Sequence, residues 1–319
     1  MNAVPGKILL TGATGFVGQA LDARLRSEGR RLLGTARRSG QLGTGTPVAA
    51  AELRPDQDWS ACLAHTHAVV HLAARVHVMD ERAADPLAAF RLANTAGTLN
   101  LARQSAAAGV RRFVFVSSIK VNGEQTAPGR AFRFDDAPAP LDPYGVSKRE
   151  AEEGLRALGA TSGMEIVIVR PPLVYGPGVK ANFAALMRAV RRGWPLPLGD
   201  VTANRRSLVA LDNLVDLLVS CINHPAAAGQ TLLVSDGEDL STAELLRRMG
   251  KALGRPARLL PVPASLLEAS AALLGQRAVA QRLLGSLQVD IAHTCHTLGW
   301  SPPVSVDEGL RRAATGLPA

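Results

Sequence analysis

Residues 7–18 read KILLTGATGFVG, and this stretch decides the fold. The apolar run 7–10 is typical of a buried strand, three glycines follow at a GxxGxxG spacing, and an amphipathic helical pattern runs through 17–27. In this order the glycines let the backbone approach a pyrophosphate, and the helix N-terminus offers unpaired N–H groups to it. The stretch therefore predicts a dinucleotide cradle made of Gly12, Thr14, Gly15, Phe16, Val17 and Gly18.

Apolar strands and amphipathic helices alternate through the first half of the chain. We expect strands at 7–10, 31–35, 48–51, 68–71, 112–117 and 165–170, and helices at 17–27, 86–108 and 144–158. This alternation predicts an α/β fold of the Rossmann type, a doubly wound parallel sheet with helices on both faces.

The pattern changes after Arg170, where closely spaced prolines punctuate short elements. We expect a dinucleotide-binding domain at 1–172 and a smaller substrate lobe at 173–319. Further strands at 207–209 and 231–234 suggest that a segment around 207–236 returns to the first domain, which would make the substrate lobe discontinuous.

Charge and hydropathy exclude several classes of protein. The net charge is +9, but aromatic residues are only 4% of the chain and no basic run is interleaved with them, so we do not expect a nucleic-acid partner. Apolar residues are dense from 259 to 289, yet prolines and charges interrupt them before the roughly 20 residues that a transmembrane helix needs. The N-terminus has no signal-peptide pattern. We expect a soluble protein without a transmembrane segment.

Cysteine and histidine usage points to the cytoplasm and to no metal site. The three cysteines lie far apart without a CxxC spacing, which argues against a disulfide scaffold or a thiolate metal site and fits a reducing compartment. His65, His67 and His77 form no convincing metal-binding set.

The end of the second predicted strand bears on the choice of cofactor. An NAD-binding chain would carry an acidic residue there to hold the ribose hydroxyls, but this chain has Ala36 followed by Arg37 and Arg38. Arginine can bind a 2′-phosphate through paired hydrogen bonds. The pattern favours NADP(H), with NAD(H) possible; otherwise the arginines form a solvated basic loop.

Candidate catalytic residues lie on one predicted helix and at one strand end. Tyr144 and Lys148 are four residues apart and share a helix face, where an ammonium group can favour the phenolate. Ser117 and Ser118 follow the apolar strand at 112–117, and a serine there can hydrogen-bond a substrate oxygen. The alternative role for either serine is capping of the strand end.

Together these motifs resemble the extended short-chain dehydrogenase/reductase family, also called the NAD-dependent epimerase/dehydratase family, over essentially the whole chain. The matching segments are TGATGFVG at 11–18, HLAA at 71–74, Asn94 with Gly97-Thr98, SSIKVNG at 117–123, YGVSK at 144–148 and RPPLVYGPG at 170–178.

The resemblance implies a role for each matching residue. Ser118, Tyr144 and Lys148 would be catalytic, Tyr144 as the acid/base and Lys148 as the ribose-binding residue that lowers its pKa. The cofactor would also contact Leu72, Ala73, Ala74, Ser117, Pro171 and Leu173. A UDP-sugar would contact Ser118, Lys120, Asn122, Tyr144, Asn182, Pro197, Leu198 and Arg206. The family's late Arg-x-x-Asp phosphate-binding element is not matched in this chain, because the arginine nearest before Asp290 is Arg282.

The resemblance leaves the reaction open. Dehydratases of the family carry an Asp-Glu pair where this chain has Ile119-Lys120, so dehydration is not expected. The NADP pattern favours NADPH-dependent reduction of the C4 keto group of a UDP-4-keto-6-deoxy-N-acetylhexosamine, as in bacterial O-antigen synthesis. The alternative is a UDP-Glc or UDP-GlcNAc type 4-epimerase with tightly bound NAD; a lesser one is a non-catalytic NADP-binding sensor.

The resemblance also implies an assembly. In related enzymes the helices corresponding to 86–108 and 144–158 pair across a dimer as a four-helix bundle. We therefore expect a homodimer.

Overall fold

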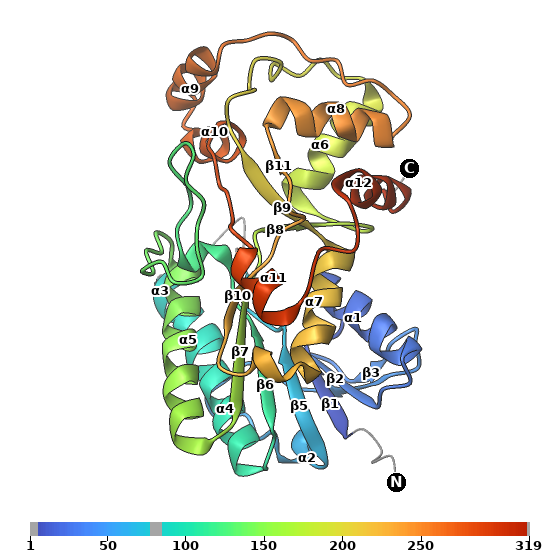
Figure 1. The fold of residues 1–319 in the computed structure, drawn as a ribbon, viewed down its shortest axis with the longest axis vertical. Coiled ribbons are helices and arrows are strands. Elements are labelled where there is room, and N and C mark those ends of the chain that lie inside the picture. Colours follow the sequence, from blue (N-terminus) through green and yellow to red (C-terminus); the bar gives the residue numbers. More distant parts are fainter. Residues whose placement is uncertain (1–5, 77–84, 318–319) are drawn as a thin grey trace.

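The computed structural model describes residues 6–76 and 85–317. It contains a large sheet in the strand order β10-β7-β6-β5-β1-β2-β4-β3, in which every neighbouring pair is parallel except β3 with β4 (Figure 1). The expected parallel α/β fold is confirmed. The strands are β1 (Lys7–Thr11), β2 (Leu32–Ala36), β3 (Gly40–Gln41), β4 (Pro47–Ala50), β5 (Thr66–His71), β6 (Arg112–Val116), β7 (Glu165–Arg170) and β10 (Thr231–Leu233).

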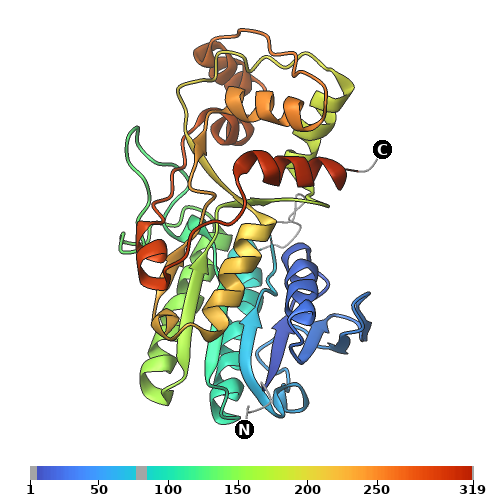
Figure 2. The same cartoon turned by 45° about the vertical axis from the view of Figure 1, so that its right-hand side comes forward.

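Helices cover both faces of this sheet, because its central strands are apolar on both sides. One face packs against α1 (Phe16–Ser27) and α7 (Leu211–Asn223), which lie side by side (Figures 1 and 2). The other face packs against helices from three segments of the chain. These are α2 (Ser60–Leu63), α3 (Pro86–Phe90), α4 (Thr98–Ala107) and α5 (Pro143–Ser162).

The predicted helix at 86–108 is not regular. A π-helical stretch, η1 (Arg91–Gly97), separates α3 from α4. Its buried Asn94 bonds both the backbone N–H of Arg75 (2.8 Å) and the backbone carbonyl of Arg75 (3.0 Å). Local π-helical geometry often marks a functional site, and here the inserted turn ties the loop after β5 to the helix layer.

A second lobe lies above the carboxyl ends of the large sheet (Figures 1 and 2). Its three-stranded sheet joins β8 (Leu173–Tyr175), β9 (Arg206–Ala210) and β11 (Asp239–Leu240). The strand expected near 207 thus belongs to this small sheet, whereas α7 and β10 lie with the large one. The lobe's helices are α6 (Ala181–Arg192), α8 (Thr242–Ala252), α9 (Ala264–Leu273), α10 (Arg277–Leu284) and α12 (Val306–Thr315).

The two lobes have separate apolar cores. Tyr175, Met187 and Leu246 are buried in the upper core, apart from the two clusters that cover the faces of the large sheet. Three short elements lie between or beside these layers, namely η2 (Ile119–Val121), η3 (Pro225–Ala227) and α11 (Ala292–Leu298). Among the described residues no helix combines the length and the apolar character needed to cross a bilayer.

Candidate active site

The glycine turn between β1 and α1 leaves room only for glycine at two positions. Gly12 has φ +68°, and a Cβ there would lie 2.9 Å from the backbone nitrogen of Ala73. A Cβ on Gly18 would lie 2.2 Å from the carbonyl oxygen of Gly12. Gly15 begins α1 without a side-chain cap, so the first N–H groups of the helix face outward for an anion.

A buried histidine fixes the loop that follows β5. The hydroxyl of Thr11 lies 2.7 Å from Nδ1 of His71 and accepts a hydrogen bond from the backbone N–H of Ala73 at 3.2 Å. Nε2 of His71 lies 2.9 Å from the hydroxyl of Thr98. Burial, and after it the charge of Lys148, lowers the pKa of His71 to about 3, so its imidazole is neutral at physiological pH. His71 therefore positions Ala73 and its neighbours Leu72 and Ala74, which are half-buried.

Arg37 and Arg38 project from the end of β2. Both side chains are exposed, and neither has a hydrogen-bond or ion-pair partner within residues 6–76 and 85–317. Ala36, the last residue of β2, brings no negative charge. This corner of the sheet can accept an anion.

Tyr144 and Lys148 lie on the first two turns of α5. Asp142 caps this helix by accepting the N–H of Gly145 at 2.6 Å. Nζ of Lys148 donates to the carbonyl oxygen of Val116 at 2.9 Å and lies 5.9 Å from the centre of the Tyr144 ring. The same ammonium lies 4.4 Å from the centre of the Phe115 ring. The lysine therefore ties the first turns of α5 to the end of β6.

Burial shifts the acidity of both groups. It lowers the pKa of Lys148 to about 7, against a smaller opposing effect of the Glu152 carboxylate. Burial, followed by the nearby Asp142 carboxylate, raises the pKa of Tyr144 to about 12. Near pH 7 Tyr144 is therefore protonated, whereas Lys148 is close to the midpoint between its ammonium and amine forms. In this site of low polarity one additional positive charge would favour the phenolate.

The two serines after β6 have different surroundings. Oγ of Ser118 accepts the N–H of Lys120 at 3.2 Å and caps η2. Oγ of Ser117 is buried and has no hydrogen-bond partner within the described residues. A buried hydroxyl without a partner is costly unless a bound group satisfies it. Ser117 is therefore available to a cofactor, while Ser118 keeps a half-exposed hydroxyl beside Tyr144's helix.

Arg170 joins three segments that carry candidate site residues. Its guanidinium binds both oxygens of Glu152 on α5, at 2.9 and 2.5 Å, and the amide oxygen of Asn122 after η2, at 2.9 Å. Arg170 itself ends β7 and precedes Pro171. All three side chains are at most 3% exposed. The pairing of Glu152 with Arg170 has no signal in the sequence, because it depends on the fold; only the position of Glu152, one helical turn after Lys148, could have pointed to it.

Two residues predicted to contact the sugar are already engaged by the protein. The amide nitrogen of Asn122 donates to the carbonyl of Arg133 at 2.9 Å, so both ends of this amide are used internally. The ammonium of Lys120 pairs with Asp142 and with Glu124. A substrate contact by Asn122 would require these bonds to be exchanged.

The remaining predicted residues lie after β7 and in the second lobe. Pro171 is buried and its carbonyl accepts the N–H of Ile119 at 3.0 Å, while Leu173 is partly exposed. Asn182 is exposed at the start of α6. Arg206 donates to the carbonyl of Gly285 at 3.0 Å, and burial lowers its pKa. Of the neighbouring pair, Pro197 is exposed and Leu198 is buried in the upper core.

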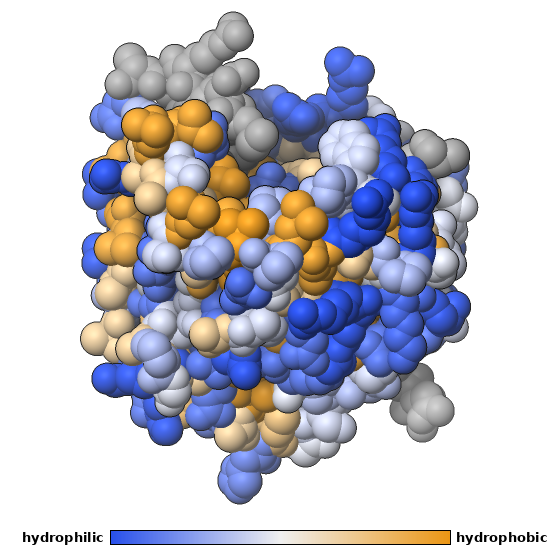
Figure 3. All heavy atoms as spheres, turned by 90° about the horizontal axis from the view of Figure 1, so that it is seen from above, coloured by the Kyte–Doolittle hydropathy of each residue, from blue (hydrophilic) through white to orange (hydrophobic). Residues whose placement is uncertain are grey.

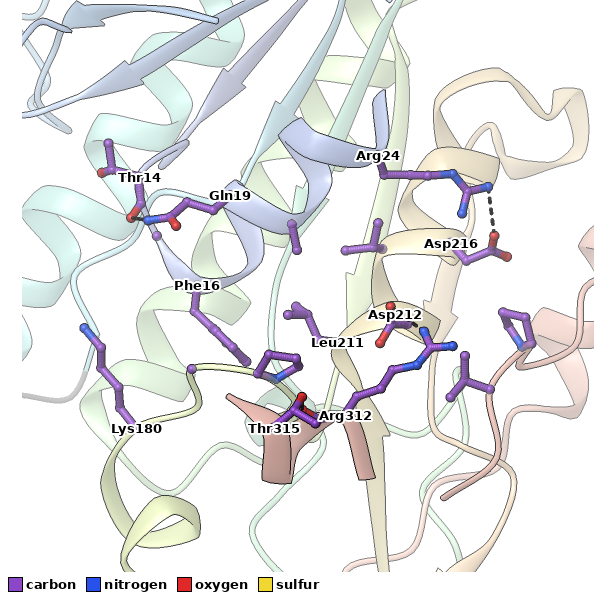
Figure 4. Close-up of a pocket in the computed structure, with 17 residues that line it drawn as sticks. Thr14, Phe16, Gln19, Arg24, Lys180, Leu211, Asp212, Asp216, Arg312 and Thr315 are labelled. Atoms are coloured by element: carbon purple, nitrogen blue, oxygen red, sulfur yellow. Dashed lines mark hydrogen bonds and ion pairs between the residues drawn. The ribbon is translucent and has the colours of Figure 1, made fainter. Parts of the chain in front are cut away.

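A cavity of about 790 Å³ opens beside the glycine turn, between α1, α7, α12 and the loop after β8 (Figure 4). Thr14 and Phe16 line it at the start of α1, and Lys180 lies on the opposite wall. Its other charged groups are paired, with Arg24 on Asp216 (3.3 Å) and Arg312 on Asp212 (2.9 Å). The cavity does not reach Tyr144 or Lys148.

These observations fit a bound dinucleotide. A Cβ at Gly12 would collide with the backbone of Ala73, so this turn requires glycine. The start of α1 has no side-chain cap, and the buried hydroxyl of Ser117 has no hydrogen-bond partner within the described residues. Within residues 6–76 and 85–317 there is no cluster of three or more His, Cys, Asp or Glu side chains that could hold a metal ion. His77, part of the histidine set considered above, lies outside these residues.

The chain is similar to known proteins over most of its length. Residues 8–234 match the NAD dependent epimerase/dehydratase family. The chain is 50% identical over 312 residues to a UDP-glucose 4-epimerase of Vibrio cholerae, covering 98% of this chain and 95% of the relative. It is 28% identical over 316 residues to a GDP-6-deoxy-D-mannose reductase of Pseudomonas aeruginosa, covering 96% and 95%. The solved structure of MoeE5 with UDP-glucuronic acid and NAD is 27% identical, covers 98% of both chains and superposes with a TM-score of 0.75.

Proposed function

Because the chain belongs to the NAD dependent epimerase/dehydratase family, we propose that it is a UDP-sugar 4-epimerase of the UDP-glucose or UDP-GlcNAc type. The observation that carries this proposal is 50% identity to a UDP-glucose 4-epimerase over almost the whole of both chains. It favours the alternative of the sequence analysis over the reductase preferred there. The presence of both Tyr144 and Lys148 speaks against a non-catalytic sensor.

In the proposed reaction the protein moves a proton at O4 of the sugar. When bound, a nicotinamide accepts hydride from C4 and returns it. Tyr144 takes the O4 proton as the C4–H bond breaks and the C4=O bond forms, and it gives the proton back when hydride returns to the opposite face of the sugar. Lys148 stabilises the phenolate, and Ser118 donates a hydrogen bond to O4.

The cofactor would lie along the carboxyl edge of the large sheet. Gly12, Thr14 and Gly15 of the turn and Phe16, Val17 and Gly18 of the first turn of α1 would hold the pyrophosphate. The hydroxyl of Ser117 would find its hydrogen-bond partner on the nicotinamide side. Leu72, Ala73, Ala74, Pro171 and Leu173 would line the path between them. The relative MoeE5 binds NAD, whereas the two free guanidiniums of Arg37 and Arg38 support an affinity for NADP(H) as well.

The nucleotide would lie in the upper lobe. We assign diphosphate contacts to Asn182 and Arg206, and the base to the segment of Pro197 and Leu198. A guanidinium suits phosphate oxygens because its planar fork donates in pairs. Lys120 and Asn122 would border the sugar. Because both ends of the Asn122 amide are hydrogen-bonded within the protein, Asn122 would shape the pocket without bonding the sugar.

One observation favours a second candidate. Arg37 and Arg38 are exposed and unpaired within the described chain, next to an uncharged strand end. NADPH-dependent reduction of a UDP-4-keto-6-deoxy-N-acetylhexosamine uses an exchangeable cofactor with a 2′-phosphate, which such a corner would bind. The relationship to a GDP-6-deoxy-D-mannose reductase supports reduction as a chemistry of related chains.

The organisation of the protein follows the same reasoning. We propose a dinucleotide-binding domain at 1–172 completed by α7 and β10, and a substrate lobe formed by the rest of 173–319.

Leu92 on η1 is 55% exposed beside α5, which supports a homodimer through α4 and α5. Three unpaired cysteines support a cytoplasmic location.

The two candidate reactions differ in whether they consume reduced cofactor: an epimerase needs none added, whereas a reductase uses one for each sugar. Purified protein is incubated with UDP-glucose or UDP-GlcNAc without added cofactor, and the C4 epimer is measured by chromatography. Formation of UDP-galactose or UDP-GalNAc is expected. A second reaction contains the 4-keto sugar with NADPH or NADH; stoichiometric loss of reduced cofactor, together with no epimerisation in the first reaction, would replace the epimerase by the reductase.

A further inference from the structure

Helices α9 and α10 form a hairpin, residues 264–284, which packs Leu267 and Leu284 against the upper core and leaves other leucines on its outer side. Seven of the ten residues of α9 are alanine or leucine, and none of the ten is buried. Leu266, Leu273 and Leu274 are 57%, 88% and 73% exposed. A helix that is apolar on all sides is normally found inside a protein or a lipid phase. The outer side of the hairpin therefore presents apolar side chains that no other part of the described chain covers.

The surroundings of the hairpin are basic. The segment 251–284 contains five basic residues, Lys251, Arg255, Arg258, Arg277 and Arg282, and a single acidic one, Glu268. Arg258, Arg277 and Arg282 are exposed, and none of them has a carboxylate partner in the part of the chain that the structure describes. Figure 3 shows apolar side chains gathered on the left half of the upper face, the side on which Figure 1 places the hairpin.

An exposed tryptophan lies on a turn joined to the same segment. Trp194 follows α6 and is 55% exposed, with the guanidinium of Arg192 at 5.3 Å from its ring centre. The backbone of Leu196 exchanges hydrogen bonds of 2.8 Å with Arg258 and Leu260, immediately before the hairpin. Tryptophan is enriched where proteins meet the headgroup layer of a membrane.

We propose that the α9–α10 hairpin docks the protein on the surface of an anionic lipid bilayer. The leucines enter the boundary between headgroups and acyl chains, and the arginines remain at the lipid phosphates, as in other interfacial helices. The helices, of 10 and 8 residues, are too short to span a bilayer. A second copy fits less well, because a symmetric contact would oppose two basic surfaces.

The test is sedimentation of the full chain with lipid vesicles. Vesicles of phosphatidylcholine mixed with phosphatidylglycerol should bind the protein, and vesicles of phosphatidylcholine alone should not. Removing both arginines, in Arg277→Gln/Arg282→Gln, should weaken binding about thirtyfold, at about fivefold for each charge. Leu273→Asp/Leu274→Asp should weaken it at least about tenfold. These side chains are exposed, so circular dichroism should show unchanged folding.

Matched controls carry the same chemical changes elsewhere. Arg103→Gln/Arg130→Gln removes two exposed arginines outside the hairpin, and Leu141→Asp changes a leucine that is 75% exposed. Both should bind vesicles like the unmodified protein. The proposal is overturned if the unmodified protein ignores anionic vesicles or if the controls weaken binding as much as the hairpin variants. It is also overturned if sedimentation without lipid shows an oligomer that Leu273→Asp/Leu274→Asp dissociates.

Discussion

Replacing Arg170 by methionine should destabilise the protein by about 3–5 kcal/mol, the cost of leaving one partner of a buried ion pair without the other. Arg170 and Glu152 are 2% and 0% exposed, and Glu152 accepts two of the three guanidinium contacts that Arg170 makes. In Arg170→Met one oxygen of Glu152 loses its only donor, the other keeps Arg156 at 3.0 Å, and the Asn122 amide oxygen is left unpaired.

The assay is urea unfolding at pH 7, followed by circular dichroism and tryptophan fluorescence. The double variant Glu152→Leu/Arg170→Met removes both charges, so it should be more stable than the sum of the single losses predicts by at least about 2 kcal/mol. Arg149→Met is the control, an exposed ion pair on α5, the helix that carries Glu152; Arg149 is 37% exposed and lies 3.4 Å from Glu153. Its cost should stay below about 1 kcal/mol. If Arg170→Met lowers the free energy of unfolding no more than Arg149→Met does, the contacts of Arg170 with Glu152 and Asn122 do not stabilise the site.

Three further predictions concern the chemistry. Tyr144→Phe should lower kcat about 10²–10⁴-fold while cofactor binding, measured by fluorescence titration, changes little; full activity would remove Tyr144 as the acid/base. Arg37→Ala should weaken NADPH binding about 10–100-fold and NADH binding hardly at all, and an equal loss for both would remove the argument for a 2′-phosphate site. His71 is held neutral with its pKa at about 3, so the unfolded state alone binds a proton as pH falls below about 6.5, and stability drops by about 1.4 kcal/mol per pH unit down to about pH 3. Urea unfolding of His71→Gln at several pH values should show a slope shallower by that amount, and an unchanged slope would contradict the neutral imidazole.

The features that sequence predicted well are those written in consecutive residues. The strand, glycine turn and helix at 7–27 follow from an apolar run, fixed glycine spacing and helical periodicity, and the expected parallel sheet follows from repetition of that unit. The spacing of Tyr144 and Lys148 likewise needs only one helix. The π-helical turn at 91–97 has no such signal, because it is imposed by the contacts of Asn94 with the chain at Arg75.

Contacts between distant segments were not accessible from sequence. A sugar contact by Lys120 and Asn122 was what the family resemblance implied. In the structure Lys120 pairs with Asp142 as well as with the nearby Glu124, and Asn122 bonds Arg170 as well as Arg133. The strand at 206–210 has the same apolar pattern as those of the large sheet, and only its pairing with β8 and β11 separates it from them. The apolar pattern of a strand indicates that it is buried, whereas the strands with which it pairs depend on the whole fold.

The difference between epimerase and reductase lies away from the residues that do the chemistry. In the proposed mechanism Tyr144, Lys148 and Ser118 would serve either reaction, because both reactions move a proton at O4 and a hydride at C4. The two reactions differ in whether the dinucleotide leaves after each turnover. That depends on how tightly the glycine turn and the end of β2, with Arg37 and Arg38, bind the dinucleotide. An epimerase with this corner could retain its cofactor partly through the 2′-phosphate, so a preference for NADP(H) would not by itself imply reduction. The chromatographic search for the C4 epimer therefore decides the reaction, and the Arg37→Ala titration decides only which dinucleotide is used.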